Sequence, residues 1–79
     1  MVKASFASLE ASLDDGEAIL SCRHGNATTV LVRGDTLVIR YWYSEVVSGR
    51  WRIDPEAGIS LTLAEFGTLL FILKKRGLP

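Results

Sequence analysis

The sequence predicts an α+β fold, in which a four-stranded antiparallel curved sheet is followed by one C-terminal helix (β-β-β-β-α) and the chain is dimeric. Short runs of β-branched and aromatic residues, separated by glycine-containing turns, fill the middle of the chain. A capping box precedes an apolar run near the C-terminus. With 79 residues, the chain makes one small domain that is marginal alone, so self-association is the expected source of further burial.

Residues 1–16 are expected to form an N-terminal arm or a short helix. Phe6, Leu9 and Leu13 lie at helical spacing, whereas the alternation from Ala7 to Leu13 is typical of a strand. Both readings stay open. The sequence "DDG" at 14–16 then indicates a turn, and residues 17–79 make up the β4α domain.

The strands follow in order, each bounded by turn residues. "HGN" at 24–26 and Gly34-Asp35 are turn signals, and the second pair suits a type II′ hairpin. Pro55 must interrupt the last strand or sit at a bulge, because it cannot donate to the ladder. The expected strands are Glu17–Arg23, Thr28–Arg33, Thr36–Tyr43 and a fourth that starts at 50–53 and resumes at 58–61.

The C-terminal helix is expected over Leu63–Arg76. Thr62 and Glu65 form the T-x-x-E capping box, and Gly77 is a suitable residue after the end of the helix. The helix has a broad apolar face and further apolar residues outside it, so it has two surfaces to cover. One is expected to be its own sheet and the other the same helix of a second subunit. The expected dimer interface contains Phe66, Leu70, Phe71 and Ile72.

Two motifs resemble those of the positive-cofactor-four family of transcriptional coactivators, which has small single-domain bacterial and phage members. "LVIRYW" at 37–42 resembles the I-R-x-W or I-R-x-x-W pattern at the end of a strand in that family. "GISLTLAEFGTLL" at 58–70 resembles its G-I-[ST]-L strand and the helix that follows. The resemblance covers roughly residues 17 to 76. Asp54 and Glu56 stand in a loop where the family usually has lysines.

The resemblance implies a homodimer with helices at its interface and curved sheets that bind single-stranded DNA or partly melted duplex. It implies no catalysis and no cofactor. Zero net charge argues against indiscriminate nucleic-acid binding. A platform for nucleic acid would combine aromatic rings, which stack on bases, with basic residues, which attract phosphate.

Arg40 and Trp42 are the leading candidates for that platform. Alternation along the strand places them together, with Tyr41 and Tyr43 on the opposite face, which is expected to be the core. An exposed tryptophan can stack on a base and an arginine attracts phosphate. The alternative is a surface cation–π pair between Arg40 and Trp42.

Arg50 and Arg52 share a face by the same alternation, and Trp51 is expected to point toward the core. The two arginines are candidate phosphate contacts; the equally weighted alternative is a solvated hairpin edge. Arg33 closes a hairpin and could reach the same side.

Other classes of function find little support. Cys22 and His24 cannot close a zinc site, so no metal is expected, and neither a catalytic triad nor a phosphate-binding glycine loop is recognisable. A single cysteine favours a reducing compartment, namely the cytoplasm of a bacterial or virus-infected cell, or the nucleus of a eukaryote. Neither a membrane-spanning run nor a signal-peptide core is visible.

The sequence therefore predicts a non-enzymatic, homodimeric single-stranded nucleic-acid-binding protein that acts in transcription, replication or repair. Its ligand is DNA or RNA. The alternative is a protein-interaction module of the same fold that has lost DNA binding and binds a polymerase or other protein through the loop at 44–57.

Overall fold

The computed structural model describes residues 5–77, and the ends of the predicted arm (1–4) and of the predicted domain (78–79) lie outside the described residues. The fold is α+β, with an antiparallel sheet and a C-terminal helix, as predicted. The elements are α1 (Phe6–Ser12), β1 (Ala18–Arg23), β2 (Asn26–Arg33), β3 (Thr36–Ser44), β4 (Trp51–Ile53), β5 (Ile59–Thr62) and α2 (Leu63–Lys75).

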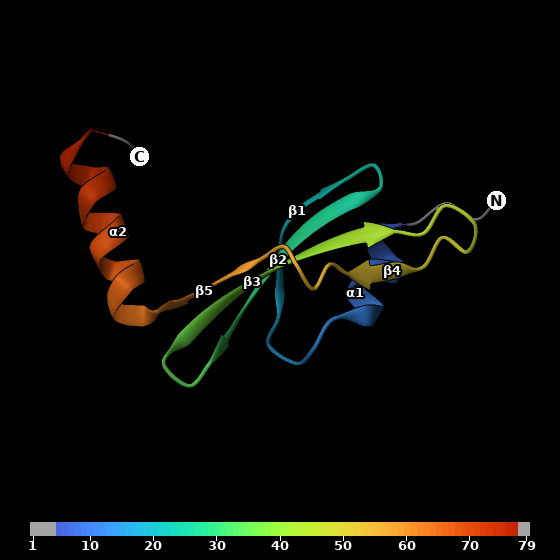
Figure 1. Cartoon of the computed structure of the whole chain (residues 1–79), viewed down its shortest axis with the longest axis horizontal. Coiled ribbons are helices and arrows are strands. Elements are labelled where there is room, and N and C mark those ends of the chain that lie inside the picture. Colours follow the sequence, from blue (N-terminus) through green and yellow to red (C-terminus); the bar gives the residue numbers. More distant parts are fainter. Residues whose placement is uncertain (1–4, 78–79) are drawn as a thin grey trace.

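The sheet is built around β3, the longest strand. Strand β2 pairs with one edge of β3 along its whole length, and β1 pairs with the outer edge of β2. The other edge of β3 is shared: β4 pairs with its C-terminal end and β5 with its N-terminal half. Strands β4 and β5 are thus the two halves of the predicted fourth strand. Figure 1 shows the strong twist of these ribbons.

The break between β4 and β5 contains Pro55, as expected from its lack of a backbone donor. Gly58 ends the break with φ +116°, and a Cβ atom there would lie 2.8 Å from the carbonyl oxygen of Ile39. Only glycine allows the chain to return this closely to β3. The hairpin at Gly34-Asp35 has a positive φ at the glycine and not at the aspartate, as a type II′ turn requires.

The ambiguous N-terminal segment is helical. Helix α1 begins at a capping box between Ser5 and Ser8. It lies across one face of the sheet, and its Leu9 is fully buried there among Ala27, Trp42 and Trp51. This cluster is flanked by Leu13, Ile19 and Cys22, and Leu31 is the further buried hydrophobic residue of the described molecule.

Helix α2 matches the predicted bounds closely but not the predicted packing. Its capping box between Thr62 and Glu65 is present, and Gly77 follows it with φ +76°. However, none of its residues is buried, and Figure 1 shows it projecting away from the sheet at the opposite end of the molecule from α1. The expectation that α2 covers its own sheet is therefore wrong; the helix that packs on the core of the sheet is α1.

Candidate nucleic-acid interface

The structure inverts the predicted faces of β3. Trp42 was expected on the open face, but only 5% of it is exposed, because Leu9 of α1 packs against it. Tyr41 and Tyr43 were expected in the core, but each is 44% exposed on the face that α1 leaves uncovered. Trp51 points into the core as predicted, with 8% exposure. A buried indole has no free face for a nucleobase.

The polar atoms around Trp42 hold it in the core. Its indole Nε1 donates a 2.8 Å hydrogen bond to the hydroxyl of Thr29, which is itself fully buried. That hydroxyl donates in turn to Oε2 of Glu17 at 2.5 Å. Because the indole N–H and the Thr29 hydroxyl both have partners, the hydrogen bonds offset the cost of burying these polar groups.

Arg40 completes this network. Its Nε donates to Oε2 of Glu17 at 2.9 Å, its second nitrogen pairs with Oε1 of the same carboxylate, and its Cζ lies 5.2 Å from the centroid of the Trp42 ring. The side chain of Arg40 is only 17% exposed and that of Glu17 is fully buried. The alternative reading of Arg40 and Trp42 as a cation–π pair is thus observed. It lies on the covered face rather than on the surface.

The protonation of this pair follows from the balance of two effects. Burial disfavours the charged form of Glu17, but hydrogen bonds from Arg40, Thr29 and the Asp14 backbone outweigh it and lower the pKa of the carboxyl. The hydrogen bonds to Glu17, opposed by burial, raise the pKa of Arg40. Both groups are therefore charged, and they form an ion pair.

Arg33 is exposed and lies on the same covered face, where it forms a 3.0 Å ion pair with Asp14. Arg52 is also exposed, but it belongs to the open face: it stands opposite Tyr43 in the β3–β4 ladder. Its Nε pairs with Oε1 of Glu45 at 3.0 Å, and this hydrogen bond is the main reason that the pKa of Glu45 is lowered. Arg50 is exposed in the loop before β4, outside the strand in which it was expected.

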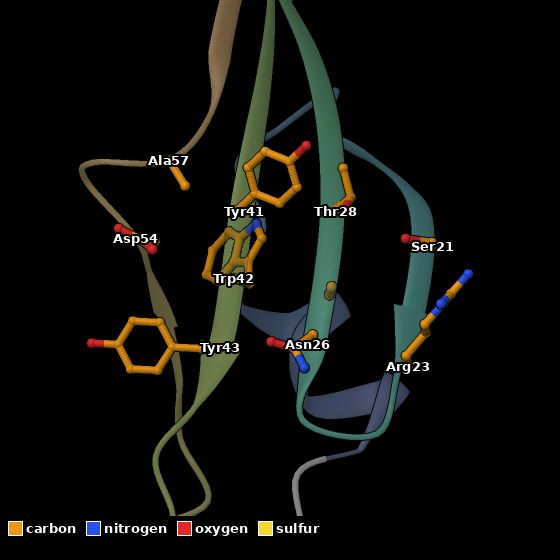
Figure 2. A pocket seen from close by; sticks show the side chains of 10 residues that line it. Ser21, Arg23, Asn26, Thr28, Tyr41, Trp42, Tyr43, Asp54 and Ala57 are labelled. Atoms are coloured by element: carbon orange, nitrogen blue, oxygen red, sulfur yellow. The ribbon is translucent and has the colours of Figure 1, made fainter.

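The open face contains a shallow depression that the sequence reasoning missed. It has a volume of about 460 Å³ and lies over β1, β2 and β3 and the loop after β4 (Figure 2). The sequence did contain an indication of it: Tyr41 and Tyr43 alternate with Trp42, so the two tyrosines must share the face opposite to the tryptophan. The residues that line it are Ser21, Arg23, Asn26, Ala27, Thr28, Tyr41, Trp42, Tyr43, Asp54 and Ala57.

The lining of this depression combines aromatic, polar and charged groups. In Figure 2 the ring of Tyr41 leans from β3 toward β2, whereas the ring of Tyr43 points to the other side of β3, where Asp54 also lies; Arg23 lies beyond β2. The amide of Asn26 lies between these groups. Such an arrangement offers flat surfaces for stacking and separate hydrogen-bonding groups at the rim.

The predicted dimer residues lie on the projecting helix. Leu70, Phe71 and Ile72 are 43%, 64% and 44% exposed, and Phe66 is half-buried. The open face of the sheet beside α2 is also apolar. It carries Val32 and Ile59, at 55% and 54% exposure, and the half-buried Val30, Leu37, Ile39 and Leu61.

Within residues 5–77, no group of three or more histidine, cysteine, aspartate or glutamate side chains is placed to hold a metal ion. Among the same residues, no helix is long and apolar enough to cross a membrane. No family model, curated protein sequence or solved structure matches the chain. The resemblance to the positive-cofactor-four family therefore rests on the quoted motifs alone.

Proposed function

We propose that this chain is a homodimeric, non-enzymatic protein that binds single-stranded nucleic acid on the open face of its sheet and acts in transcription, replication or repair. The observation that carries the proposal is the pair Tyr41 and Tyr43, two residues apart on one uncovered strand face and each 44% exposed. Rings placed in this way suit stacking on unpaired bases, because every base has a π-face.

Basic and polar groups flank the two rings. Arg23 lines the same depression, and Arg52 lies beside Tyr43 in the neighbouring strand. Both can contact phosphates of a strand that crosses the rings. The proposed nucleic-acid site therefore lies on the face opposite to Arg40 and Trp42, and it includes Arg52 of the residues expected from the sequence.

Unpaired strands are the expected ligand because paired bases hide their faces within the duplex. The two exposed rings cannot stack on a base that remains paired and stacked within a duplex. Zero net charge also gives little non-specific attraction to duplex phosphates. Binding should therefore depend on the rings as well as on the arginines.

The dimer part of the proposal rests on the apolar surface that the single chain leaves open. Helix α2 buries no residue, and an apolar half-sheet lies next to it. Monomeric proteins of this size rarely expose apolar surface so continuously, and homodimer interfaces are the usual place for it. A second copy of α2 and its sheet is the simplest complementary surface.

The second candidate function is the protein-interaction module. Val46 and Val47, at the tip of the β3–β4 loop, are 75% and 87% exposed, so two adjacent apolar side chains face the solvent. Ser48 and Arg52 both donate to Glu45, which holds the base of this loop in place. A protein partner could bind this tip.

Fluorescence anisotropy with a labelled mixed-sequence oligonucleotide tests the main proposal at low and at physiological salt. Salt-sensitive binding at micromolar protein is expected, with single strands competing better than a duplex of equal length. Replacing Val46 and Val47 by serine should leave this binding unchanged. Absence of salt-sensitive binding would contradict the proposal and favour the protein-interaction module.

A further inference from the structure

Asp54 is an unexpected residue in a nucleic-acid site, because a carboxylate repels phosphate. It nevertheless lines the same depression as Tyr41, Tyr43 and Arg23. Figure 2 shows it beside the rings, on the side away from Arg23. Asp54 thus places a carboxylate next to the stacking surface, on the side of β3 where Arg52 also lies, whereas Arg23 lies beyond β2.

The position of Asp54 is fixed by two hydrogen bonds. Its backbone N–H donates to the carbonyl oxygen of Tyr41 at 2.8 Å, so the residue is tied to the strand that carries the rings. Its Oδ1 accepts from the backbone N–H of Glu56 at 3.0 Å. Within residues 5–77, Asp54 takes part in none of the ion pairs.

A strand lying across the rings must place its phosphates and its bases relative to this charge. Phosphates are attracted to Arg23 and Arg52 and are repelled by Asp54. A base edge that meets Asp54 must supply a hydrogen-bond donor, because a carboxylate only accepts. Cytosine supplies its exocyclic N4 amino group, whereas thymine and uracil carry the O4 carbonyl there and present N3–H only between two carbonyl oxygens.

We propose that Asp54 is a specificity-determining residue that makes the Tyr41–Tyr43 surface prefer bases with an exocyclic amino group, so that cytosine is bound more tightly than thymine. This inference rests on the proposed function, since it concerns the same site. It gives a role to the carboxylate that stands where the resembled family usually has a lysine.

The test compares oligo-dC with oligo-dT of equal length by fluorescence anisotropy on the whole protein. Both are pyrimidine strands, so stacking area and charge are matched. The wild-type protein should bind oligo-dC about ten-fold more tightly, which is the lower end of the effect of one hydrogen bond to a charged group. Asp54→Asn should bring the two affinities within about two-fold, because an amide can donate as well as accept.

Glu56→Gln is the matched control. It removes the same charge two residues away, at an exposed residue outside the depression, and should keep the preference for oligo-dC. Melting curves should show that both variants are folded. If Asp54→Asn proves unstable, Asp54→Ser provides the second variant.

Equal wild-type affinities, a preference for oligo-dT, or an unchanged preference in a folded Asp54 variant would overturn the role of Asp54 and leave the proposed function standing. Salt-sensitive binding of neither oligonucleotide would overturn the proposed function, and the inference with it.

Discussion

Two nitrogens of Arg40 donate hydrogen bonds to the carboxylate of Glu17, and the side chain of Glu17 is completely buried. The pair joins the turn after α1 to the middle of β3. Arg40 also lies over the ring of Trp42, which packs with Leu9 of α1 in the core. The residue that looked most like a phosphate ligand in the sequence is thus part of the internal structure.

Glu17→Gln should destabilise the fold by about 2 kcal/mol, because Arg40 loses a charged hydrogen-bond acceptor. Chemical denaturation at neutral pH measures this loss. Asp14→Asn is the control: Asp14 also pairs with Arg40, but its side chain is 51% exposed, so its loss should cost less than about 1 kcal/mol. Equal effects of the two changes would contradict the assigned role of Glu17.

The same pair predicts a pH dependence. Since the pKa of Glu17 is lower in the folded chain than in the unfolded chain, its stabilising effect is complete above the unfolded pKa, about 4.3, and is lost as the pH falls through the folded value. The difference in unfolding free energy between wild type and Glu17→Gln should therefore shrink below about pH 4. A difference that stays constant down to pH 2 would show that the charge of Glu17 contributes nothing.

Trp42→Ala should cost about 3–5 kcal/mol of stability, the usual loss for a buried aromatic side chain. It also removes the donor to Thr29. Tyr43→Ala removes an exposed ring of the same strand and should cost less than about 1 kcal/mol. Thermal melts of both variants check the face assignment. If Trp42→Ala left the melting temperature unchanged and Tyr43→Ala unfolded the protein, Tyr43 rather than Trp42 would be on the buried face.

Leu70→Glu or Phe71→Glu should convert the proposed dimer into monomers or unfolded chain, because either change places a charge in the apolar surface of α2. Thr68→Glu is the control. Thr68 is exposed, and its hydroxyl bonds back to the carbonyl of Ala64 in its own helix. Sedimentation at tens of micromolar measures the mass. A wild-type monomer there, or equal effects of the threonine and leucine changes, would count against the dimer.

The sequence predicted much of the local structure because local signals govern it. Thr62 with Glu65 starts α2, Gly34-Asp35 turns the central hairpin, and Pro55 divides the last strand. Each depends on residues close in the chain. These signals carry little information about which elements pack together.

The face of β3 could not be predicted in the same way. Both faces of the strand carry apolar or aromatic residues, so alternation alone does not say which is buried. The choice depends on α1, a seven-residue helix whose pattern fitted a strand equally well. The buried face of β3 is the one that carries Trp42, because Leu9 of α1 packs against this residue. Arg40 and Trp42 were assigned to the wrong face for this reason, although the two exposed tyrosines belong to the same strand.

The most direct test of the account is the titration of a labelled single-stranded oligonucleotide with the Tyr41→Ala/Tyr43→Ala double variant, paired with a melting curve. Each stacked base contributes about 1–3 kcal/mol, so the loss of one stacked base should lower the affinity about five- to 150-fold. The melting curve of the double variant should stay close to that of the wild type. Unchanged binding in a folded double variant would contradict the claim that this face holds the nucleic acid.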